Sequence, residues 1–422
     1  MKNIFQLLHL KENFRGLPDL CLIILLLSGC KKTALEPQIA GTVINSSAQA
    51  ATATATATEI HTNTVIFDGG GSTGYHSFRI PSIVKTTNGT LIALAEGRMA
   101  NNKDYGNINL IYKRSTDNGA TWSALGEVVG VGPGTWGNPT AVVDATNGRV
   151  WVFMSWNAGD HNQFGTDGFQ KIDAWGDRKV YVSYSDNHGV SWSAPQDLTN
   201  TLLPASYKWD AMGPGTGIQK KQVSHQNRLI IPAIGRNIYS GNGGVTWQYQ
   251  LISSGTSEGT IVEKLNGTLM RNDRAVSSQW ELSKRRRVSI GSIENGFPTW
   301  TSDNTLLDPA CQGSILRYNT DSPNRILFLN SASTDTRGKM RVRISYDEGQ
   351  TWPISRRIYD WLTEQQAVDQ GKGGYSSMVK TNDFHVGALI EINEAVGDPN
   401  SHRSIEFHKF NLAWILNGNI EP

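Results

Sequence analysis

The chain has 422 residues, of which 18% are charged, and 39 Lys and Arg residues against 37 Asp and Glu leave a net charge of only +2. This balance excludes a disordered acidic or basic chain and gives no support for a nucleic-acid-binding protein, which should carry a strong basic excess. The 43 Gly and 13 Trp residues indicate a turn-rich, all-β fold that is long enough to bury a sizeable core.

The first thirty residues have the pattern of a lipoprotein signal. A basic start precedes an apolar run at residues 20–27, and small residues then lead to Cys30. The run is too short to span a bilayer comfortably, and small residues before a cysteine suit cleavage by a lipoprotein signal peptidase. We expect residues 1–29 to be removed and Cys30 to carry lipid, so that the protein is an exported bacterial membrane lipoprotein facing the periplasm or the cell surface. An ordinary signal with an incidental cysteine is the alternative.

A polar tether follows the signal. Residues 30–60 show no apolar periodicity and include an alternating Ala-Thr run at residues 51–58. Such composition is typical of a flexible linker. The folded domain is therefore expected over residues 61–422.

The folded part contains a repeat, in which a short apolar strand, a turn and a second, more apolar strand recur six times. The copies lie at residues 79–98, 138–157, 215–236, 258–274, 312–333 and 375–393. Self-similarity at a period of this size indicates a repeat architecture.

A second motif, called here the turn box, interleaves with the repeat. Five copies share a Ser, then Asp, Asn or Glu, a Gly and a closing Trp; they lie at residues 115–122, 185–192, 240–247, 292–300 and 345–352. Asp or Asn and Gly at these offsets are typical of tight turns in which the side chain hydrogen bonds to the backbone. The boxes are therefore expected to be structural rather than catalytic or metal-binding, and each Trp is expected to pack between neighbouring units.

Two strands from each repeat and two that flank each box give four strands per unit. Six such units predict a six-bladed β-propeller. A β-sandwich with long insertions, the alternative, does not explain six matched units. The only helical segment expected lies around residues 361–369.

Propeller geometry brings the ends of the inner strands to one place. Several arginines, a glutamate and a tyrosine would share this pocket, because they stand at matching strand ends of the repeats: Arg79, Arg98, Arg236, Glu258, Arg274, Arg337 and Tyr375. Converging guanidinium groups are costly to bury unless an anion neutralises them, and their planar fork suits a carboxylate or phosphate.

The sequence Phe-Arg-Ile-Pro at residues 78–81, the turn boxes and the segment at residues 213–219 resemble the bacterial exo-α-sialidases, or neuraminidases, over roughly residues 63–415. The resemblance implies hydrolysis of terminal sialic acid from glycoproteins, glycolipids and oligosaccharides. Neither a metal nor a nucleotide cofactor is expected, because the nine His residues show no metal-ligand spacing and no Gly-rich phosphate loop precedes a helix. The resemblance also implies the site residues. Arg79, Arg274 and Arg337 match the arginine triad that holds the sialic acid carboxylate, Asp104 the acid/base, Tyr375 the nucleophile, Glu258 its partner, and Arg98 a further pocket arginine. Arg271 competes with Arg274, and Arg341 and Arg343 compete with Arg337.

The chemistry has a physical rationale. Sialic acid carries a carboxylate on its reacting carbon, so an ionised carboxylate nucleophile would be repelled. A tyrosine is neutral, but with a pKa of about 10 it needs a neighbouring base and cations to become a nucleophile. Glu258 supplies the base and the arginines supply the field, and Asp104 would protonate the leaving group and then activate water, with net retention.

Other readings of the sequence remain open. A trans-sialidase is the close rival among enzymes, and a non-catalytic propeller that binds sialylated glycans is the rival of another class. The excursion at residues 158–178 could border the aglycone side of the site or be a surface insertion. Cys311 is expected to be a packed residue, the basic run at residues 284–287 a solvated strand rather than a nucleic-acid patch, and the protein a monomer.

Overall fold

The computed structural model describes residues 58–70, 72–393 and 403–422. The predicted signal, the lipid-carrying Cys30 and nearly all of the tether therefore lie outside the described residues. No helix within the described ranges is long and apolar enough to cross a membrane.

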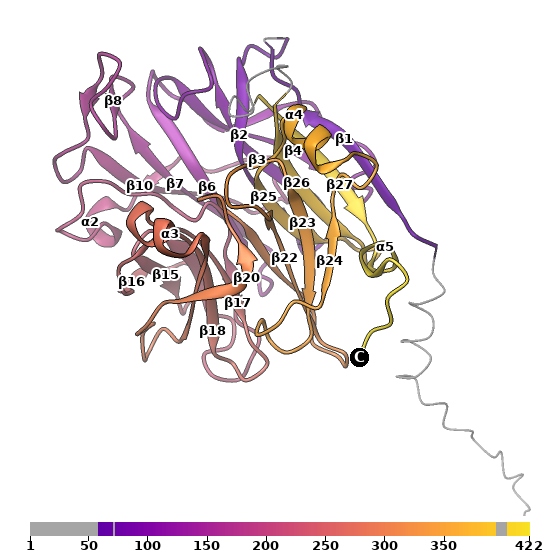
Figure 1. The fold of residues 1–422 in the computed structure, drawn as a ribbon. Helices are drawn as coiled ribbons and strands as arrows, with labels where there is room; N and C mark the ends of the chain where they lie inside the picture. Colours follow the sequence, from indigo (N-terminus) through magenta and orange to yellow (C-terminus); the bar gives the residue numbers. More distant parts are fainter. Residues whose placement is uncertain (1–57, 71, 394–402) are drawn as a thin grey trace, which may run out of the picture. The chain divides into compact units, whose positions relative to one another are not determined.

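The predicted all-β class is confirmed, because strands hydrogen bonded into several sheets cover far more of the described chain than the short helices do (Figure 1). One four-stranded sheet has the order β1-β27-β26-β25, with β1 at His61–Phe67, β25 at Lys372–Lys380, β26 at Val386–Ile392 and β27 at Ser404–Phe410.

A nine-stranded sheet consists of two runs that are joined through a single pair, Ile108 with Thr135. The first run contains β2 (Ser77–Lys85), β3 (Leu91–Arg98), β4 (Ile108–Ser115) and β5 (Gly126–Val129). The second contains β6 (Thr135–Val143), β7 (Val150–Asn157), β10 (Arg178–Ser185) and β11 (Gln196–Asp197), and β12 (Gly215–Thr216) pairs with β6.

Three further four-stranded sheets follow in chain order. They are β13 (Ile218–Gln219), β14 (Leu229–Ala233), β15 (Arg236–Ser240) and β16 (Gln248–Leu251); β17 (Thr256–Glu263), β18 (Leu269–Ala275), β19 (Arg285–Gly291) and β20 (Thr301–Leu307); and β21 (Ser314–Asn319), β22 (Arg325–Ser331), β23 (Met340–Ser345) and β24 (Ile354–Arg357). A small two-stranded sheet pairs β8 (His161–Asn162) with β9 (Gln170–Lys171).

Each of the six predicted repeats forms a pair of adjacent antiparallel strands. The third repeat differs at its end, because its second strand stops at Ala233 and Arg236 opens the next strand, β15. Arg236 is fully buried there and donates to both carboxylate oxygens of Asp210, at 2.6 and 2.8 Å. The expectation that Arg236 reaches the shared pocket is therefore wrong.

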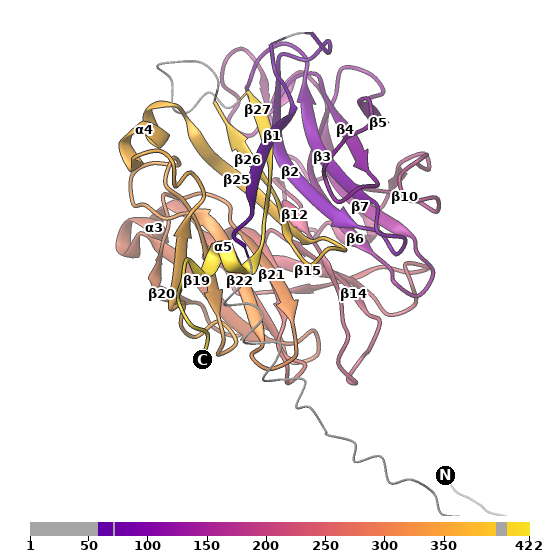
Figure 2. The same cartoon turned by 90° about the vertical axis from the view of Figure 1, so that its right-hand side faces the viewer.

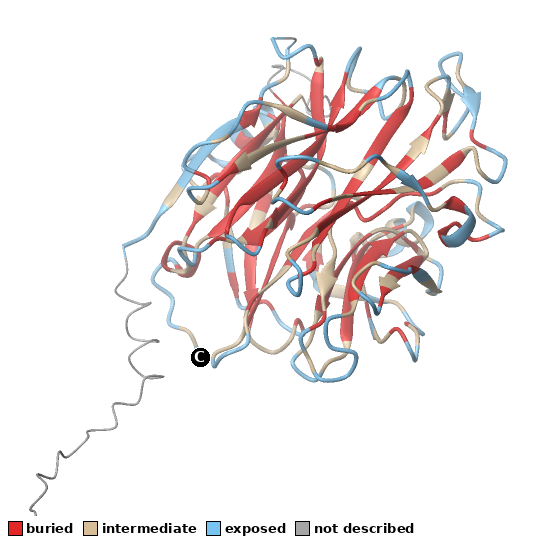
Figure 3. Cartoon of the chain, turned by 180° about the vertical axis from the view of Figure 1, so that it is seen from behind, coloured by how far each residue is buried: buried red, intermediate tan, exposed pale blue. Residues whose placement is uncertain are grey.

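The first and last strands of the described chain lie side by side. Residues of β1 pair with residues of β27 from His61 with Phe410 to Phe67 with Ile405, and Figure 2 shows the indigo and yellow strands next to each other. This pairing adds a strand from the start of the domain to a sheet built otherwise from its end. Most of β1 is exposed, in contrast to the buried strands that it joins (Figure 3).

The turn boxes are held by their own side chains. In the first box, Asp117 accepts hydrogen bonds from the backbone N–H of Thr121 at 2.9 Å and from the hydroxyl of Ser115 at 2.7 Å. Asn187, Asn242 and Asp347 accept the equivalent bonds in three other boxes. The fourth box departs from this pattern, because the carboxylate of its Glu294 pairs with Arg228 instead.

The box tryptophans pack against the neighbouring unit, as the sequence predicts. Trp122 contacts Phe407 edge-on at a ring-centre distance of 5.1 Å, and Trp247 contacts Phe153 in the same way at 4.7 Å. These rings are parts of apolar clusters that fill the space between sheets. Burial of large aromatic surfaces there is a main source of the stability of the fold.

Helices are short, and the predicted one is present as α4 (Glu364–Asp369), which begins with a capping box at Thr363. Three others were not expected: α2 (Thr199–Leu202), α3 (Ser277–Ser283) and α5 (Leu412–Leu416). The basic run at residues 284–287 is only partly solvated. Arg286 is fully buried and donates to the carboxylate of Asp308 and to the carbonyl of Cys311.

Replacing Asp117 with Ala tests the structural role of the boxes. The substitution removes the acceptor of three turn hydrogen bonds, so we expect the midpoint of thermal unfolding to fall by roughly 2–4 °C. The catalytic rate per folded molecule should stay that of the parent. A loss of activity without a change in the unfolding midpoint would contradict the structural role.

The contact between β1 and β27 predicts a pH dependence of stability. Burial, together with the charge of His408, lowers the pKa of His61 to about 3. In the unfolded chain His61 is protonated below about pH 6.5, whereas in the folded chain it stays neutral down to about pH 3. The free energy of unfolding therefore falls as the pH is lowered through that window. The centres of the His61 and Trp414 rings lie 4.2 Å apart. The substitution His61→Phe keeps a ring against Trp414 but removes the group that can be protonated.

The measurement is the unfolding midpoint of the parent and of His61→Phe between pH 7 and pH 4. We expect the midpoint of the variant to fall less steeply with decreasing pH. Parallel curves would show that His61 is protonated equally in both states.

Candidate active site

The structure gathers all seven predicted site residues. A cavity of about 480 Å³ is lined by Arg98, Asp104, Glu258, Arg274 and Tyr375. The guanidinium groups of the other two, Arg79 and Arg337, each lie 5.5 Å from the centre of the Tyr375 ring. The residues come from strands β2, β3, β17, β18 and β25 and from two loops, so the site forms only when the sheets come together.

Arg79 is fixed by a buried carboxylate. Its Nε and Nη2 atoms donate to the two oxygens of Glu391 on β26, each at 3.2 Å. Glu391 also accepts the backbone N–H of Ile80 at 2.8 Å and that of Tyr375 at 2.9 Å, and its side chain is fully buried. A bidentate pair of this kind sets the plane of the guanidinium as well as its position. The negative charge of Glu391 raises the pKa of Arg79 despite burial.

The backbone next to Arg79 is strained. Ile80 has φ of 59°, a left-handed conformation that β-branched residues rarely adopt, and it lies where the register between β2 and β3 shifts. The hydrogen bond from Ile80 to Glu391 helps to hold this conformation. Strain of this kind persists where the surroundings over-determine it, and here it accompanies the placement of Arg79 beside Tyr375.

Arg98 lines the cavity and contacts the loop that carries Asp104. It is 1% exposed and donates to Glu96 through Nη2 at 2.6 Å, and the same nitrogen lies 2.8 Å from Oδ1 of Asp104. Asp104 also accepts from Nη1 of Arg79 at 3.2 Å. The Asp104 side chain is nevertheless 73% exposed, so it sits at the cavity mouth with its carboxylate turned toward two arginines.

The two arginines control the protonation of Asp104. Desolvation acts to raise the pKa of this carboxyl group, but Arg98 and Arg79 outweigh it and hold the pKa well below its usual range. Asp104 is therefore a carboxylate at neutral pH in the free protein.

Tyr375 and Glu258 both line the cavity and are in direct contact. The Tyr375 hydroxyl donates to Glu258, and Nη1 of Arg274 donates both to Glu258 at 2.8 Å and to the Tyr375 oxygen at 3.0 Å. Desolvation by burial, followed by the charge of Glu258, raises the pKa of Tyr375 well above its usual value, although Arg274 and Arg337 oppose the shift. Tyr375 is therefore a phenol at rest, and it can lose its proton only as Glu258 takes it.

The competing arginines lie elsewhere. Arg271 is fully buried in a pair with Asp273, Arg341 pairs with Glu364 at 2.9 Å, and Arg343 donates to Asn330. None of the three lines the cavity. The structure therefore places Arg274 and Arg337, rather than their neighbours, beside Tyr375.

Three charged residues of the site were missed in the sequence. Glu391 interrupts the apolar strand β26, and a lone charge in such a strand is the signal that could have found it. Glu96, opposite Arg79 in the sheet, accepts from Arg98. Arg178 lines the cavity and donates to Asn138 at 2.7 Å, and burial lowers its pKa to about 10. It opens the third strand of its unit, which the alignment of first and second strands does not cover.

Cys311 is buried against Ile80 and Tyr375, as expected of a packed residue. Burial raises the pKa of its thiol to about 11. Within the described ranges, no group of three or more His, Cys, Asp or Glu residues is placed to hold a metal ion.

Comparison with known proteins identifies the family of the chain. Residues 89–387 match a family described as a BNR repeat-like domain. An exo-alpha-sialidase of Aspergillus fumigatus is 46% identical over 365 residues, which cover 82% of this chain and 86% of the relative. The chain belongs to the sialidase family. The resemblance of the sequence to these glycoside hydrolases is thereby confirmed.

Solved sialidase structures share the fold. A Hadza microbial sialidase superposes with a TM-score of 0.67 at 24% identity, covering 82% of this chain and 68% of that one. A leech intramolecular trans-sialidase, complexed with 2,7-anhydro-Neu5Ac, gives a TM-score of 0.70 at 18% identity, covering 86% and 71%.

The geometry of Arg79 predicts the effect of a conservative change in this sialidase. Arg79→Lys keeps the charge but loses the fork that engages Glu391 and that would engage a substrate carboxylate, so we expect kcat/KM for a sialoside to fall at least tenfold, about 1.4 kcal/mol. Arg341→Lys is the matched control, because Arg341 lies outside the cavity and should tolerate the change. Equal activity of Arg79→Lys and the parent would show that Arg79 does not hold the substrate.

Proposed function

We propose that this chain is an exo-α-sialidase that hydrolyses terminal sialic acid from glycoproteins, glycolipids and oligosaccharides with net retention, through a covalent intermediate on Tyr375. The observation that carries the proposal is the hydrogen-bonded Tyr375–Glu258 pair, which has Arg79, Arg274 and Arg337 beside it. Sialidases with a tyrosine nucleophile are an established exception to the two-carboxylate scheme of most glycosidases.

The arginines bind the carboxylate of sialic acid. Arg274 is already paired with Glu258 and Arg79 with Glu391, so the net positive charge that remains for a ligand is modest. Arg337 supplies a further guanidinium on the side of Tyr375. Binding one carboxylate among these three groups places the anomeric carbon next to the tyrosine oxygen, because that carbon bears the carboxylate.

The first displacement forms the bond between the Tyr375 oxygen and the anomeric carbon. Glu258 accepts the phenolic proton as attack proceeds, so no free phenolate accumulates, in keeping with the raised pKa of Tyr375. The leaving oxygen takes a proton from Asp104. In the second displacement Asp104 removes a proton from water, which attacks the same carbon and breaks its bond to the Tyr375 oxygen. Glu258 returns its proton to that oxygen, which restores the phenol.

Asp104 must gain a proton before it can act as an acid. Its low pKa in the free protein comes from Arg98 and Arg79, opposing desolvation. A substrate carboxylate that bonds to Arg79 takes over part of that interaction and adds a nearby negative charge. Both effects raise the pKa of Asp104, so substrate binding itself prepares the acid.

We also propose that the six four-strand units form a six-bladed propeller around this site. In support, the nine-stranded sheet divides at the single pair between β4 and β6 into one unit of four strands and a second unit of four to which β12 is added. With the four separate four-stranded sheets these two units make six. The site residues stand at strand ends or in the loops beside them, where the inner strands of such a propeller converge.

Transfer is the rival reaction. The leech neighbour is an intramolecular trans-sialidase, so a shared fold alone does not separate hydrolysis from internal transfer. The products separate them: hydrolysis releases sialic acid with retained configuration, and internal transfer releases a 2,7-anhydro sugar. A non-catalytic glycan-binding protein would release neither.

We propose that the protein is exported. The similar exo-alpha-sialidase comes from a fungus and gives no support for a bacterial lipid anchor. The anchor at Cys30 stays a prediction, as do the monomeric state and the absence of nucleic-acid partners.

Two substitutions test the assigned roles. Tyr375→Phe keeps the ring but removes the attacking oxygen, so we expect at least a thousandfold loss of kcat on natural and on activated aryl sialosides alike. Asp104→Ala should lose far more on natural sialosides than on an aryl sialoside, whose good leaving group needs no protonation in the first step.

Proton NMR of the first-formed product completes the test. We expect the α-anomer of free sialic acid to appear before it mutarotates. The β-anomer would contradict the tyrosine mechanism, and a 2,7-anhydro product would assign internal transfer instead of hydrolysis.

A further inference from the structure

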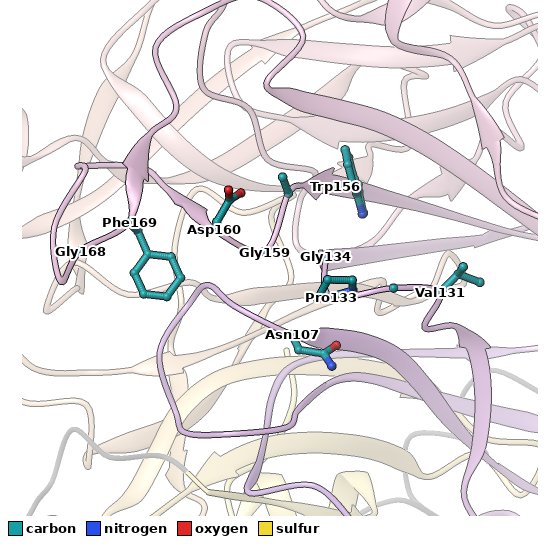
Figure 4. Close-up of a pocket in the computed structure, with 11 residues that line it drawn as sticks. Asn107, Val131, Pro133, Gly134, Trp156, Gly159, Asp160, Gly168 and Phe169 are labelled. Carbon is teal, nitrogen blue, oxygen red and sulfur yellow. The ribbon is translucent and has the colours of Figure 1, made fainter.

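A second cavity, of about 660 Å³, lies beside the catalytic one. Figure 4 shows Phe169 and Trp156 at opposite ends of it, with Asp160 and Asn107 on two of its sides. The segment 131–134, which leads from β5 to β6, supplies another wall.

The two cavities share their walls. Tyr105 lines the catalytic cavity, and its ring packs against Phe169 of the second cavity at 4.6 Å. On β7, Asn157 lines the catalytic cavity and its neighbour Trp156 lines the second one. Since Tyr105 directly follows Asp104, the second cavity adjoins the side of the site from which the acid/base acts.

The second cavity has a different chemistry from the catalytic one. No Lys, Arg or His is among the residues that line it, whereas Arg98, Arg178 and Arg274 line the catalytic cavity. Trp156 and Phe169 offer aromatic surface, and the Asn107 amide and the Asp160 carboxylate offer hydrogen-bonding groups. The C–H face of a pyranose packs on aromatic rings by dispersion while its hydroxyls bond to such groups. This lining suits an uncharged sugar and disfavours an anion.

The cavity is held in shape without a ligand. The Asn157 amide donates to the carbonyls of Ala158 and His161, at 2.8 and 3.1 Å. The buried Asn162 side chain accepts three backbone N–H groups of the loop before Phe169. Gly159 lies so close to the carbonyl of Pro133 that any side chain there would overlap it. Preorganisation of this kind lowers the entropic cost of binding.

We propose that the second cavity binds the neutral sugar from which sialic acid is cleaved, so that the excursion at residues 158–178 forms the leaving-group side of the site. The proposal rests on the proposed function, because Asp104 marks the leaving-group side only if it is the acid. Phe169 is then a specificity-determining residue that contacts the sugar after the scissile bond.

The test compares 3′-sialyllactose with a methyl α-sialoside. The leaving groups of both substrates need protonation, but only that of 3′-sialyllactose is a sugar. A substitution that merely disturbed Asp104 through Tyr105 would therefore slow the cleavage of both substrates. For Phe169→Ala we expect kcat/KM for 3′-sialyllactose to fall at least about fivefold, and that for the methyl sialoside to change less than about twofold. Activity on the methyl sialoside also reports that the variant is folded.

Trp175→Ala is the matched control. Trp175 belongs to the same excursion and is 43% exposed, but it lines neither cavity, so both substrates should be cleaved at the parent rate. Equal losses on both substrates in Phe169→Ala, or no loss on either, would overturn the proposal. Release of no sialic acid from any sialoside by the parent would instead refute the proposed function.

Discussion

The site depends on the ion pair and the hydrogen bonds that the buried carboxylate of Glu391 makes. Its two oxygens receive the guanidinium of Arg79 and the backbone N–H groups of Ile80 and Tyr375. One charge on β26 therefore positions Arg79 on β2 and Tyr375 on β25, the proposed carboxylate-binding arginine and nucleophile, which are almost 300 residues apart in the sequence. A buried charge is tolerated only when it is paired and fully hydrogen bonded, so the fold and the geometry of the site enforce each other.

The remaining charges of the cavity are arranged in pairs that a substrate can rearrange. Arg274 donates hydrogen bonds to both Glu258 and Tyr375, and the Asp104 carboxylate pairs with Arg79 and Arg98. In the free protein each arrangement holds a reactive group in its resting form, the phenol of Tyr375 and the carboxylate of Asp104. In the mechanism that we propose, a substrate carboxylate competes for the same arginines and thereby raises the pKa of Asp104 when this residue has to act as an acid. Beyond Asp104 no Lys, Arg or His lines the aromatic cavity at Trp156 and Phe169, which we propose meets the uncharged part of the substrate.

Much of this arrangement could be predicted from the sequence, because repeats report which positions are equivalent. Matching strand ends brought Arg79, Glu258, Arg274 and Tyr375 to one place, and the self-contained hydrogen bonding of the boxes follows from the spacing of their residues. What the repeats could not report is pairing between units. Glu391 and Arg79 belong to two different sheets and form an ion pair between them. Strand β1 pairs with β27 from the other end of the chain, and Arg236 forms an ion pair with Asp210. Such long-range pairs depend on register and burial that no local pattern contains. Arg286 was misjudged for the same reason, since its partners Asn272 and Asp308 lie on other segments.

The central claim is that Tyr375 forms the covalent intermediate. A fluorinated sialosyl fluoride tests it most directly, because its electron-poor ring slows both displacements while its good leaving group still allows the first, so the intermediate accumulates. Mass spectrometry of the digested protein should then find one added sugar on the peptide that contains Tyr375, and none in Tyr375→Phe. A label on Glu258 or Asp104 would contradict the account, and so would turnover of the reagent by Tyr375→Phe.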